Sequence, residues 1–260
     1  MVVLLVLYGL QRPDGRLHVV FLDVGHGDAV YVQTPSGRQA LIDGGSDPRQ
    51  TLTALGKRMP FWDRSLDLVV LSSPDADRLA GLVAVLERYD VALVATSPEV
   101  GTGEVYARWE ALLAARPAGS WGRLLAGDTW ELDTDVALNV LWPPGERDGP
   151  CVLQLVHGEV SFLLMGDATT RVEDELITDR DVVLRSQVLQ LPRQGDDSCC
   201  MAPFLQAVQP ELAVVGRSGD RPLAPHLAAR LMDVPLYITG RHGTLELISD
   251  GIAIRVRSRR

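Results

Sequence analysis

Residues 17–45 read LHVVFLDVGHGDAVYVQTPSGRQALIDGG, and this stretch decides the fold class. Three runs rich in β-branched residues are separated by the tight loop GHGD and the turn PSGR, which predicts three successive strands. The first and third runs end close to Asp23 and Asp43, and Asp28 follows the glycines of the loop. The stretch therefore predicts a sheet whose loops carry carboxylates.

After residue 45 the chain alternates between strands and helices. The uninterrupted apolar run at 66–73 is typical of a strand buried on both faces. From Leu79 onward, apolar residues recur at the spacing of an amphipathic helix. The second half repeats this order, and Thr170 with Glu173 predicts a capping box that opens a helix through about Ile177. The periodicity predicts an α/β fold.

The composition is that of a folded, acidic protein. Of 260 residues, 46% are hydrophobic and 23% are charged, so disorder, collagen and coiled coil are excluded as overall descriptions. The formal net charge of −9 excludes a non-specific nucleic-acid coat, whose affinity comes from neutralising phosphates. The 25 basic residues include a single lysine, Lys57. The three cysteines form no CxxC pair and give no disulfide framework.

An apolar segment opens the chain, where residues 1–10 read MVVLLVLYGL. Ten helical residues span roughly 15 Å, about half of a bilayer core, and the segment lacks the basic region of a signal peptide. It is either a first buried strand or the end of a membrane helix. We expect an N-terminal segment over 1–16 and one domain over 17–260. The basic tail RVRSRR, residues 255–260, is expected to be solvated or to contact phosphates or anionic lipids weakly.

Acidic residues follow the predicted strands, and the loops after strand ends are the usual sites of α/β folds. These residues are Asp23 and Asp28 in FLDVGHGDA, Asp43 in LIDGG, Asp75 and Asp77 in SSPDADR, and Asp167 in LLMGD. Such a carboxylate cluster could hold hard cations for hydrolysis of phosphoesters or amides. Taken alone, Asp75 and Asp77 also suit the start of a helix. We interpret Asp23, Asp28 and Asp43 as residues that shape the floor of a site through backbone hydrogen bonds.

The chain resembles a known family over about residues 17–257, through motifs that occur in order and with compatible spacing. The motifs are FLDVGHGDA, LIDGG, LDLVVLSSPDADRLAGL and FLLMGD, followed by VLQLPRQG. They are similar to those of the metallo-β-lactamase-type domain of the ComEC competence proteins. The resemblance implies a four-layer αββα sandwich that follows a multispanning membrane channel for DNA uptake. It also implies a metal-dependent nuclease that degrades the strand not imported.

The metal-binding signature of that family is broken in this chain. The family's histidine-rich loop, similar to H-P-D-A-D-H, corresponds to Ser73-Pro74-Asp75-Ala76-Asp77-Arg78. Its P-H-H-G motif corresponds to Pro192-Arg193-Gln194-Gly195, and a later G-H-P motif corresponds to Leu223-Ala224-Pro225. The histidines of all three motifs are missing here. Asp167, which matches the family's bridging metal carboxylate, is retained together with both aspartates of the first loop.

We therefore expect no bound metal and a replacement of charge. Arginine stays protonated and offers no lone pair to a metal ion. The resemblance places Arg78 and Arg193 where the family holds its cations. The hypothesis predicts that these two arginines pair with Asp75, Asp77 and Asp167.

Two functions remain open at this point. The first is a ComEC-like domain linked to DNA uptake and associated with a membrane, which keeps the fold as a non-catalytic pseudoenzyme. Its partners would be DNA or a membrane channel protein. The second is an active metal-dependent hydrolase or DNA nuclease, in which Asp75, Asp77 and Asp167 hold Mg²⁺ or Mn²⁺ rather than Zn²⁺. The missing imidazoles and the two arginines favour the first function.

Overall fold

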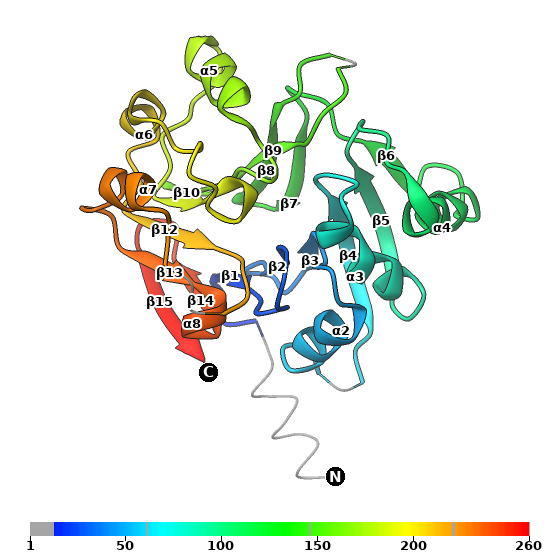
Figure 1. Cartoon of the computed structure of the whole chain (residues 1–260). Coiled ribbons are helices and arrows are strands. Elements are labelled where there is room, and N and C mark those ends of the chain that lie inside the picture. Colours follow the sequence, from blue (N-terminus) through cyan, green and yellow to red (C-terminus); the bar gives the residue numbers. More distant parts are fainter. Residues whose placement is uncertain (1–12, 61, 146, 220–221, 260) are drawn as a thin grey trace.

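Two β-sheets pack face to face in this protein, and helices lie on their outer sides (Figure 1). The computed structural model describes residues 13–60, 62–145, 147–219 and 222–259. The periodicity predicts an α/β fold and the family resemblance implies a four-layer αββα sandwich, and this arrangement confirms both. Residues 1–12, which hold the predicted apolar segment, lie outside the described residues. Among the helices of the described part, none is both long enough and apolar enough to cross a bilayer.

The first sheet has eight strands in the order β15-β14-β1-β2-β3-β4-β5-β6. Neighbours from β15 to β3 are antiparallel, and those from β3 to β6 are parallel. The strands are β1 (Leu17–Phe21), β2 (Val30–Gln33), β3 (Gln39–Ile42), β4 (Ser65–Leu71), β5 (Asp90–Thr96), β6 (Trp121–Arg123), β14 (Thr244–Ser249) and β15 (Ile254–Arg259).

The second sheet has seven strands in the order β13-β12-β11-β10-β9-β8-β7. It also joins an antiparallel half, β7 to β10, to a parallel half, β10 to β13. The strands are β7 (Thr129–Asp133), β8 (Val136–Trp142), β9 (Val152–His157), β10 (Val160–Leu164), β11 (Val188–Gln190), β12 (Leu212–Val215) and β13 (Leu236–Ile238).

Helices pack on the outer face of each sheet. Those against the first sheet are α2 (Pro48–Gly56), α3 (Ala76–Leu86) and α4 (Gly103–Ala114). Those against the second are α5 (Thr170–Thr178), α6 (Ala202–Val208) and α7 (Pro225–Arg230). A single 3₁₀ turn, η1 (Pro192–Gln194), follows β11, and the short α8 (Thr239–His242) precedes β14.

The register of β1 shows how the sequence divides between two cores. Leu17, Val19 and Phe21 belong to the cluster between the two sheets. Val20, one position out of phase, belongs to the cluster under α2, α3 and α4. Because side chains alternate across a strand, a run that is apolar on both faces must be covered on both. The stretch that decides the fold class therefore supplies both cores.

The start of α5 differs from the sequence prediction. Thr169 precedes the helix, and no side chain caps it. The Glu173 carboxylate is buried and accepts hydrogen bonds from the backbone N–H groups of Cys200 (2.7 Å) and Met201 (3.1 Å). The predicted capping box of Thr170 and Glu173 is therefore wrong, because Glu173 binds the free N–H groups at the start of α6 instead.

Candidate functional site

Four segments that are distant in the sequence bring charged side chains together between the ends of the strands. Asp28 lies in the loop between β1 and β2, and Asp43 directly follows β3. Arg78 lies in the first turn of α3, after β4, and Asp167 lies between β10 and α5. The first three residues belong to segments of the first sheet and Asp167 to the second. The group therefore connects the two sheets.

The Arg78 side chain is at the centre of this group and is 0% exposed. Its Nε and Nη2 atoms donate to the two oxygens of Asp167 at 2.6 and 3.0 Å, a bidentate pair. Its Nη1 donates to Oδ2 of Asp43 at 3.0 Å. Its Nη2 also lies 2.7 Å from Oδ2 of Asp28, but that oxygen accepts no aligned hydrogen bond from any described residue, so this contact is an ion pair. One guanidinium therefore neutralises parts of three carboxylates.

Burial and the shared guanidinium shift the pKa values of these carboxyl groups in opposite directions. Burial raises the pKa of Asp28 to about 6, although the charge of Arg78 partly offsets the effect. Burial also raises the pKa of Asp43 against the opposing effects of Arg78 and Ser72. At Asp167 burial is outweighed by Arg78, which lowers the pKa of that carboxyl. Arg78, with smaller contributions from a hydrogen bond to Asp75 and from the charge of Arg193, thus keeps Asp167 ionised, but Arg78 does not fully compensate the buried Asp28 and Asp43.

Close backbone packing holds the loops of the group in place. The Gly44 N–H donates to the Arg78 carbonyl at 2.7 Å, and the Gly45 N–H donates to the Asp28 carbonyl at 2.8 Å. At Gly27, whose φ is +92°, a β-carbon would lie 1.7 Å from the Asp77 carbonyl oxygen. Only glycine allows this approach, so the glycines of GHGD bring Asp28 against the start of α3.

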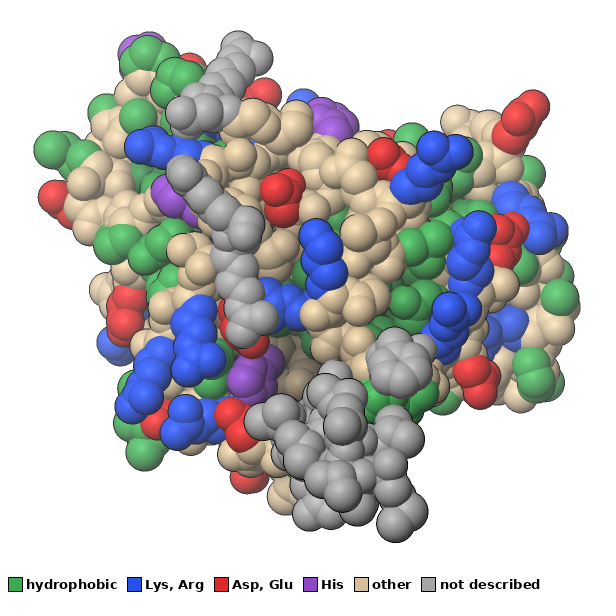
Figure 2. Space-filling model, turned by 90° about the horizontal axis from the view of Figure 1, so that it is seen from below, with side chains coloured by type: hydrophobic (Ala, Val, Ile, Leu, Met, Phe, Trp, Pro, Cys, Tyr) green, Lys and Arg blue, Asp and Glu red, His purple; other side chains and the backbone are tan. Residues whose placement is uncertain are grey.

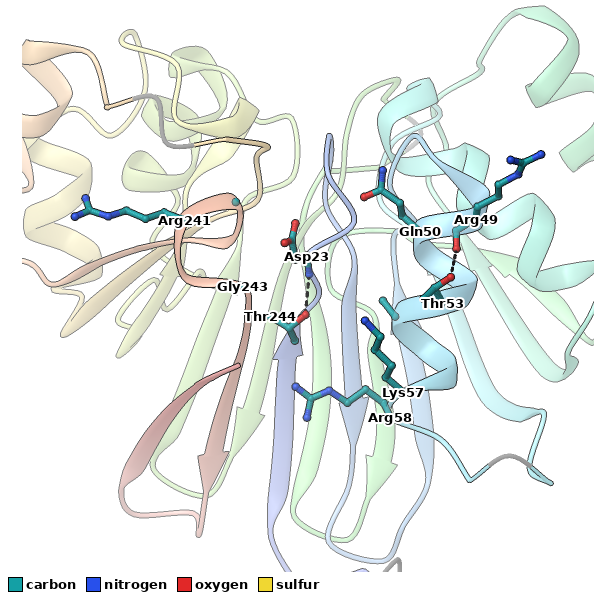
Figure 3. A pocket seen from close by; sticks show the side chains of 11 residues that line it. Asp23, Arg49, Gln50, Thr53, Lys57, Arg58, Arg241, Gly243 and Thr244 are labelled. Atoms are coloured by element: carbon teal, nitrogen blue, oxygen red, sulfur yellow. Dashed lines mark hydrogen bonds between the residues drawn. The ribbon is translucent and has the colours of Figure 1, made fainter. Parts of the chain in front are cut away.

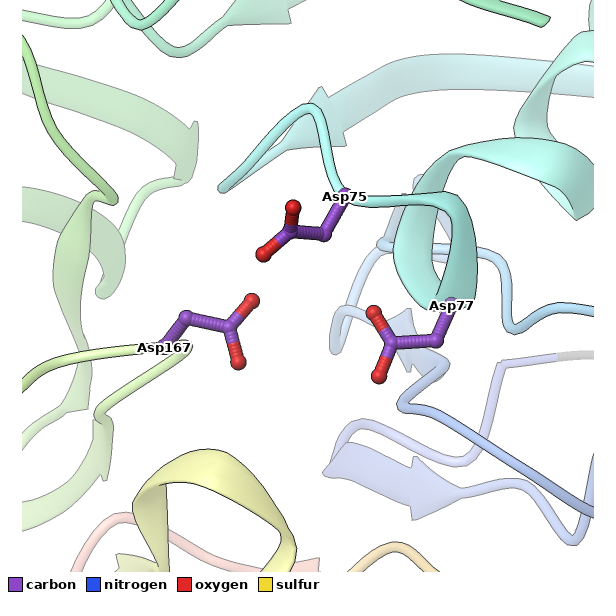
Figure 4. A group of neighbouring side chains, drawn as sticks. All are labelled: Asp75, Asp77 and Asp167. Carbon is purple, nitrogen blue, oxygen red and sulfur yellow. The ribbon is translucent and has the colours of Figure 1, made fainter. Parts of the chain in front are cut away.

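A second group of carboxylates lies at the rim of the first. Asp75, Asp77 and Asp167 point toward one another, and one oxygen of each lies within 4.8 Å of the others (Figure 4). Burial and the charges of Asp167 and Asp77 raise the pKa of Asp75. Glu99, which accepts a hydrogen bond from Ser73 Oγ at 3.4 Å, lies close enough to Asp75 for that charge to add to burial and raise the pKa of Glu99. The rim is therefore acidic.

The dinuclear metal centre implied by the family resemblance does not fit these residues. The Arg78 guanidinium, which cannot ligate a metal, already contacts both oxygens of Asp167 and one oxygen each of Asp43 and Asp28. A divalent ion at about 4 Å from it would meet repulsion of about 4 kcal/mol for each of its charges at a protein-like dielectric. These residues therefore do not support a reaction through such a centre.

Of the predicted pairings of Arg78 and Arg193 with Asp75, Asp77 and Asp167, the ion pairs of the described residues include that between Arg78 and Asp167. Arg78 contacts Asp167, but its other partners are Asp43 and Asp28, not Asp75 or Asp77. Within the described part of the chain, no ion pair within 4.0 Å includes Arg193, and its side chain is exposed. The neighbouring Gln194 binds Asp77 instead, with Nε2 at 2.8 Å from Oδ2.

Other residues lie where sequence reasoning did not place them. Asp23 is exposed and outside the Arg78 group, and its backbone N–H donates to Thr244 Oγ1 at 3.1 Å. Ser72 was missed, although it donates twice to Asp43, from N at 2.8 Å and from Oγ at 2.6 Å. Its place directly after Leu71, the last apolar residue of the run at 66–73, is the one signal that could have identified it.

Comparison with known proteins places this geometry in a family. The sequence pattern of the Metallo-beta-lactamase superfamily matches residues 22–216. Competence protein ComA of Neisseria gonorrhoeae is 29% identical over 207 residues, which are 78% of this chain and 27% of that protein. This chain thus spans about a quarter of the length of that relative. The similarity is consistent with a metallo-β-lactamase-fold domain of the ComEC type.

Two solved structures share the fold at low sequence identity. One is CmlA, a diiron beta-hydroxylase from Streptomyces venezuelae, with a TM-score of 0.57 and 13% identity over 95% of this chain and 55% of that one. The other is a diphosphatase from the PhnP family, with a TM-score of 0.52 and 14% identity over 90% of this chain and 98% of that one. At these identities the likeness concerns the fold alone. With three quarters of its length matched by the family pattern, the chain belongs to the metallo-β-lactamase superfamily.

Proposed function

We propose that this chain is a domain of a DNA-uptake protein in which an internal ion cluster has replaced the metal centre, so that the domain acts as a non-catalytic structural or binding module. The similarity to a competence protein supports the link to DNA uptake. The buried Arg78, in contact with Asp28, Asp43 and Asp167, is the observation that carries the loss of metal chemistry. Its partners would be DNA and a membrane channel protein.

The ion cluster can take over the structural part of a metal's role. A metal ion in such a fold draws ligands from loops of both sheets and thereby fixes the loops relative to one another. Arg78 binds carboxylates in a similar way. It makes a bidentate contact with Asp167 of the second sheet and contacts Asp43 and Asp28, which lie in two loops of the first sheet. A guanidinium cannot lower the pKa of a bound water as a metal does, so the cluster supplies no hydroxide for hydrolysis.

The rim carboxylates favour a second candidate, a hydrolase that uses one metal ion. Asp75, Asp77 and Asp167 offer three oxygen atoms within 4.8 Å of one another. Oxygen ligands of this kind suit Mg²⁺ or Mn²⁺. The nearby Arg78 charge and the engagement of both Asp167 oxygens by that arginine count against tight binding.

Metal content and nuclease activity, measured on the same sample, test the proposal. We expect substoichiometric metal by plasma mass spectrometry after equilibration with Mn²⁺, and no cleavage of single-stranded DNA above the buffer rate. The informative variant is Asp75→Asn/Asp77→Asn, because neither side chain forms an ion pair with Arg78, so the three ion pairs of Arg78 are kept. Asp135→Asn/Asp233→Asn, at exposed positions elsewhere, is the matched control. Stoichiometric metal and cleavage that only the first pair abolishes would establish the hydrolase instead.

A further inference from the structure

Basic side chains gather on one face of the first sheet, around its edge strand. In β15, Ile254 and Val256 pack against the core between the sheets. Arg255 and Arg257 alternate with them and therefore point to the outer face, where both are exposed. Figure 2 shows this side of the molecule, with arginine and lysine side chains gathered around a histidine.

Helix α2 adds two more cations to the same face. Arg257 pairs in register with Glu246 of β14, and Arg58, just after α2, reaches Glu246 with Nη1 3.3 Å from Oε2. Lys57, the single lysine of the chain, is exposed beside Arg58. We name the set Lys57, Arg58, Arg255 and Arg257 the basic underside.

A hollow of about 900 Å³ opens between α2 and the start of β14. Lys57 and Arg58 extend from α2 toward the strands across this hollow, whereas Arg49 and Arg241 direct their guanidinium groups away from it (Figure 3). Asp23 is the one acidic residue among those that line it. The hollow is large enough for a phosphate-bearing headgroup, with Lys57 as its exposed cation.

Three acids near these cations have partners within the chain, whereas Asp23 at the hollow is exposed. The Glu246 side chain is 8% exposed and contacts both Arg58 and His18, whose Nδ1 lies 3.1 Å from Oε1. The Asp14 carboxylate contacts the other nitrogen of His18 at 3.0 Å. Asp250 accepts hydrogen bonds from the backbone of residues 252 and 253 in the β14–β15 turn. Although the chain has a net charge of −9, this face presents the exposed cations Lys57, Arg255 and Arg257 to an anionic partner.

The chain enters the first sheet beside these cations. Leu17, the first residue of β1, pairs with Ser249, and Ser249 pairs with Ile254, next to Arg255. The sequence that leads to this point begins with the apolar residues 1–10. An apolar segment joined to a cationic surface is the combination that binds anionic membrane surfaces.

We propose that the basic underside docks on a membrane surface that carries anionic phospholipids, with a headgroup phosphate received in the hollow beside Lys57. Electrostatic attraction orients the domain, and no residue of the Arg78 group takes part. The proposal is independent of whether the domain hydrolyses a substrate. Nucleic acid is the alternative polyanion, and the overall negative charge and the adjacent apolar segment both favour the membrane.

Co-sedimentation of the full chain with lipid vesicles tests the proposal. We expect binding to phosphatidylcholine vesicles with about 30% phosphatidylglycerol and weak binding to phosphatidylcholine alone, with loss of the difference at high salt. Each basic residue near such a surface is worth about five-fold in the partition coefficient. Arg255→Glu/Arg257→Glu should therefore lower it at least about 25-fold, and Lys57→Glu about five-fold or more.

The matched control is Arg180→Glu/Arg185→Glu, which makes the same change of charge at exposed positions before β11. It should bind within about two-fold of the unmodified chain, because its charges lie on another part of the surface. If circular dichroism shows that Arg255→Glu/Arg257→Glu does not fold, Arg255→Gln/Arg257→Gln, which changes the charge less, takes its place. Equal losses for the basic-underside and control variants overturn the proposal, as does a lack of preference for anionic vesicles. So does a loss of single-stranded DNA binding in Arg255→Glu/Arg257→Glu with vesicle binding unchanged.

Discussion

Arg78 and Arg193 stand at corresponding places in the sequence pattern, where the family resemblance puts histidines, yet their surroundings are opposite. Arg78 is fully buried and contacts three carboxylates. Arg193 is exposed, and its backbone N–H, not its guanidinium, makes the close contact, at 3.1 Å from the Gly166 carbonyl oxygen. The same residue type is therefore an internal cation in one segment and a surface residue in the other.

Local backbone explains the difference. Arg78 lies in a regular helix whose inward face is fixed by packing on the first sheet, so its side chain must point into the group of carboxylates. Arg193 lies in η1 with φ of +49°, a left-handed conformation that turns the chain away, and the neighbouring Gln194 reaches Asp77. The fold therefore encloses the guanidinium of Arg78 and supplies it with three carboxylates, but leaves that of Arg193 at the surface.

The largest effect is expected from Arg78→Ala. Removing the guanidinium leaves the carboxylates of Asp28, Asp43 and Asp167 buried without a cation, and breaking a buried ion pair in this way costs about 3–5 kcal/mol. Urea denaturation followed by circular dichroism measures the change in the free energy of unfolding. Arg78→Lys keeps the positive charge but not the several N–H donors of the guanidinium, so its free energy of unfolding should fall less than that of Arg78→Ala. A loss below about 1 kcal/mol for Arg78→Ala would mean that the cluster does not hold the loops together.

The pH dependence of stability tests whether the cluster lacks positive charge. The pKa of Asp28 in the folded state is raised to about 6 from 3.8, so between these values the folded state binds more protons than the unfolded state. Stability contributed by this proton is present below about 4 and is lost as the pH rises through about 6, by roughly 3 kcal/mol at most. Asp28→Asn should therefore become more stable relative to the unmodified chain as the pH is raised from 4 to 7. A constant difference across that range would show that Arg78 fully compensates Asp28.

A smaller effect is expected from Gln194→Ala, which removes the hydrogen bond to Asp77. Both partners are partly buried, so the free energy of unfolding should fall by about 1 kcal/mol. The double variant with Asp77→Asn gives the coupling between the two side chains. If the losses of unfolding free energy in the two single variants add up to that of the double variant, the contact between the two side chains contributes no stability of its own.

Arg193→Ala should have the smallest effect, within about 0.5 kcal/mol, as for an ordinary surface position. Arg108→Ala is a suitable reference, because Arg108 is exposed and pairs with Glu87 at 2.9 Å. A loss for Arg193→Ala close to that of Arg78→Ala would remove the distinction between the two arginines.

Sequence reasoning reached the fold because local patterns carry it. The β-branched runs in residues 17–45 predict strands, the apolar run at 66–73 predicts a strand covered on both faces, and the family resemblance implies the four layers. The contact of Arg78 with Asp167 could also be predicted, through the family resemblance. The remaining partners could not, because Asp28 and Asp43 reach Arg78 only through close approaches such as that of Gly27 to the Asp77 carbonyl. Glu173 failed as a capping residue for the same reason, since its partners lie 27 and 28 residues away.

The contacts of Arg78 also bear on how long the folded state lasts. Its partners Asp43 and Asp167 are 35 and 89 residues away along the chain, and Asp167 belongs to the other sheet. The contact with Asp167 forms only after both sheets have docked, so we expect it to form late in folding. Removing this contact should therefore speed unfolding and leave the folding rate nearly unchanged. Arg78 would then set the lifetime of the native protein rather than the speed at which it forms.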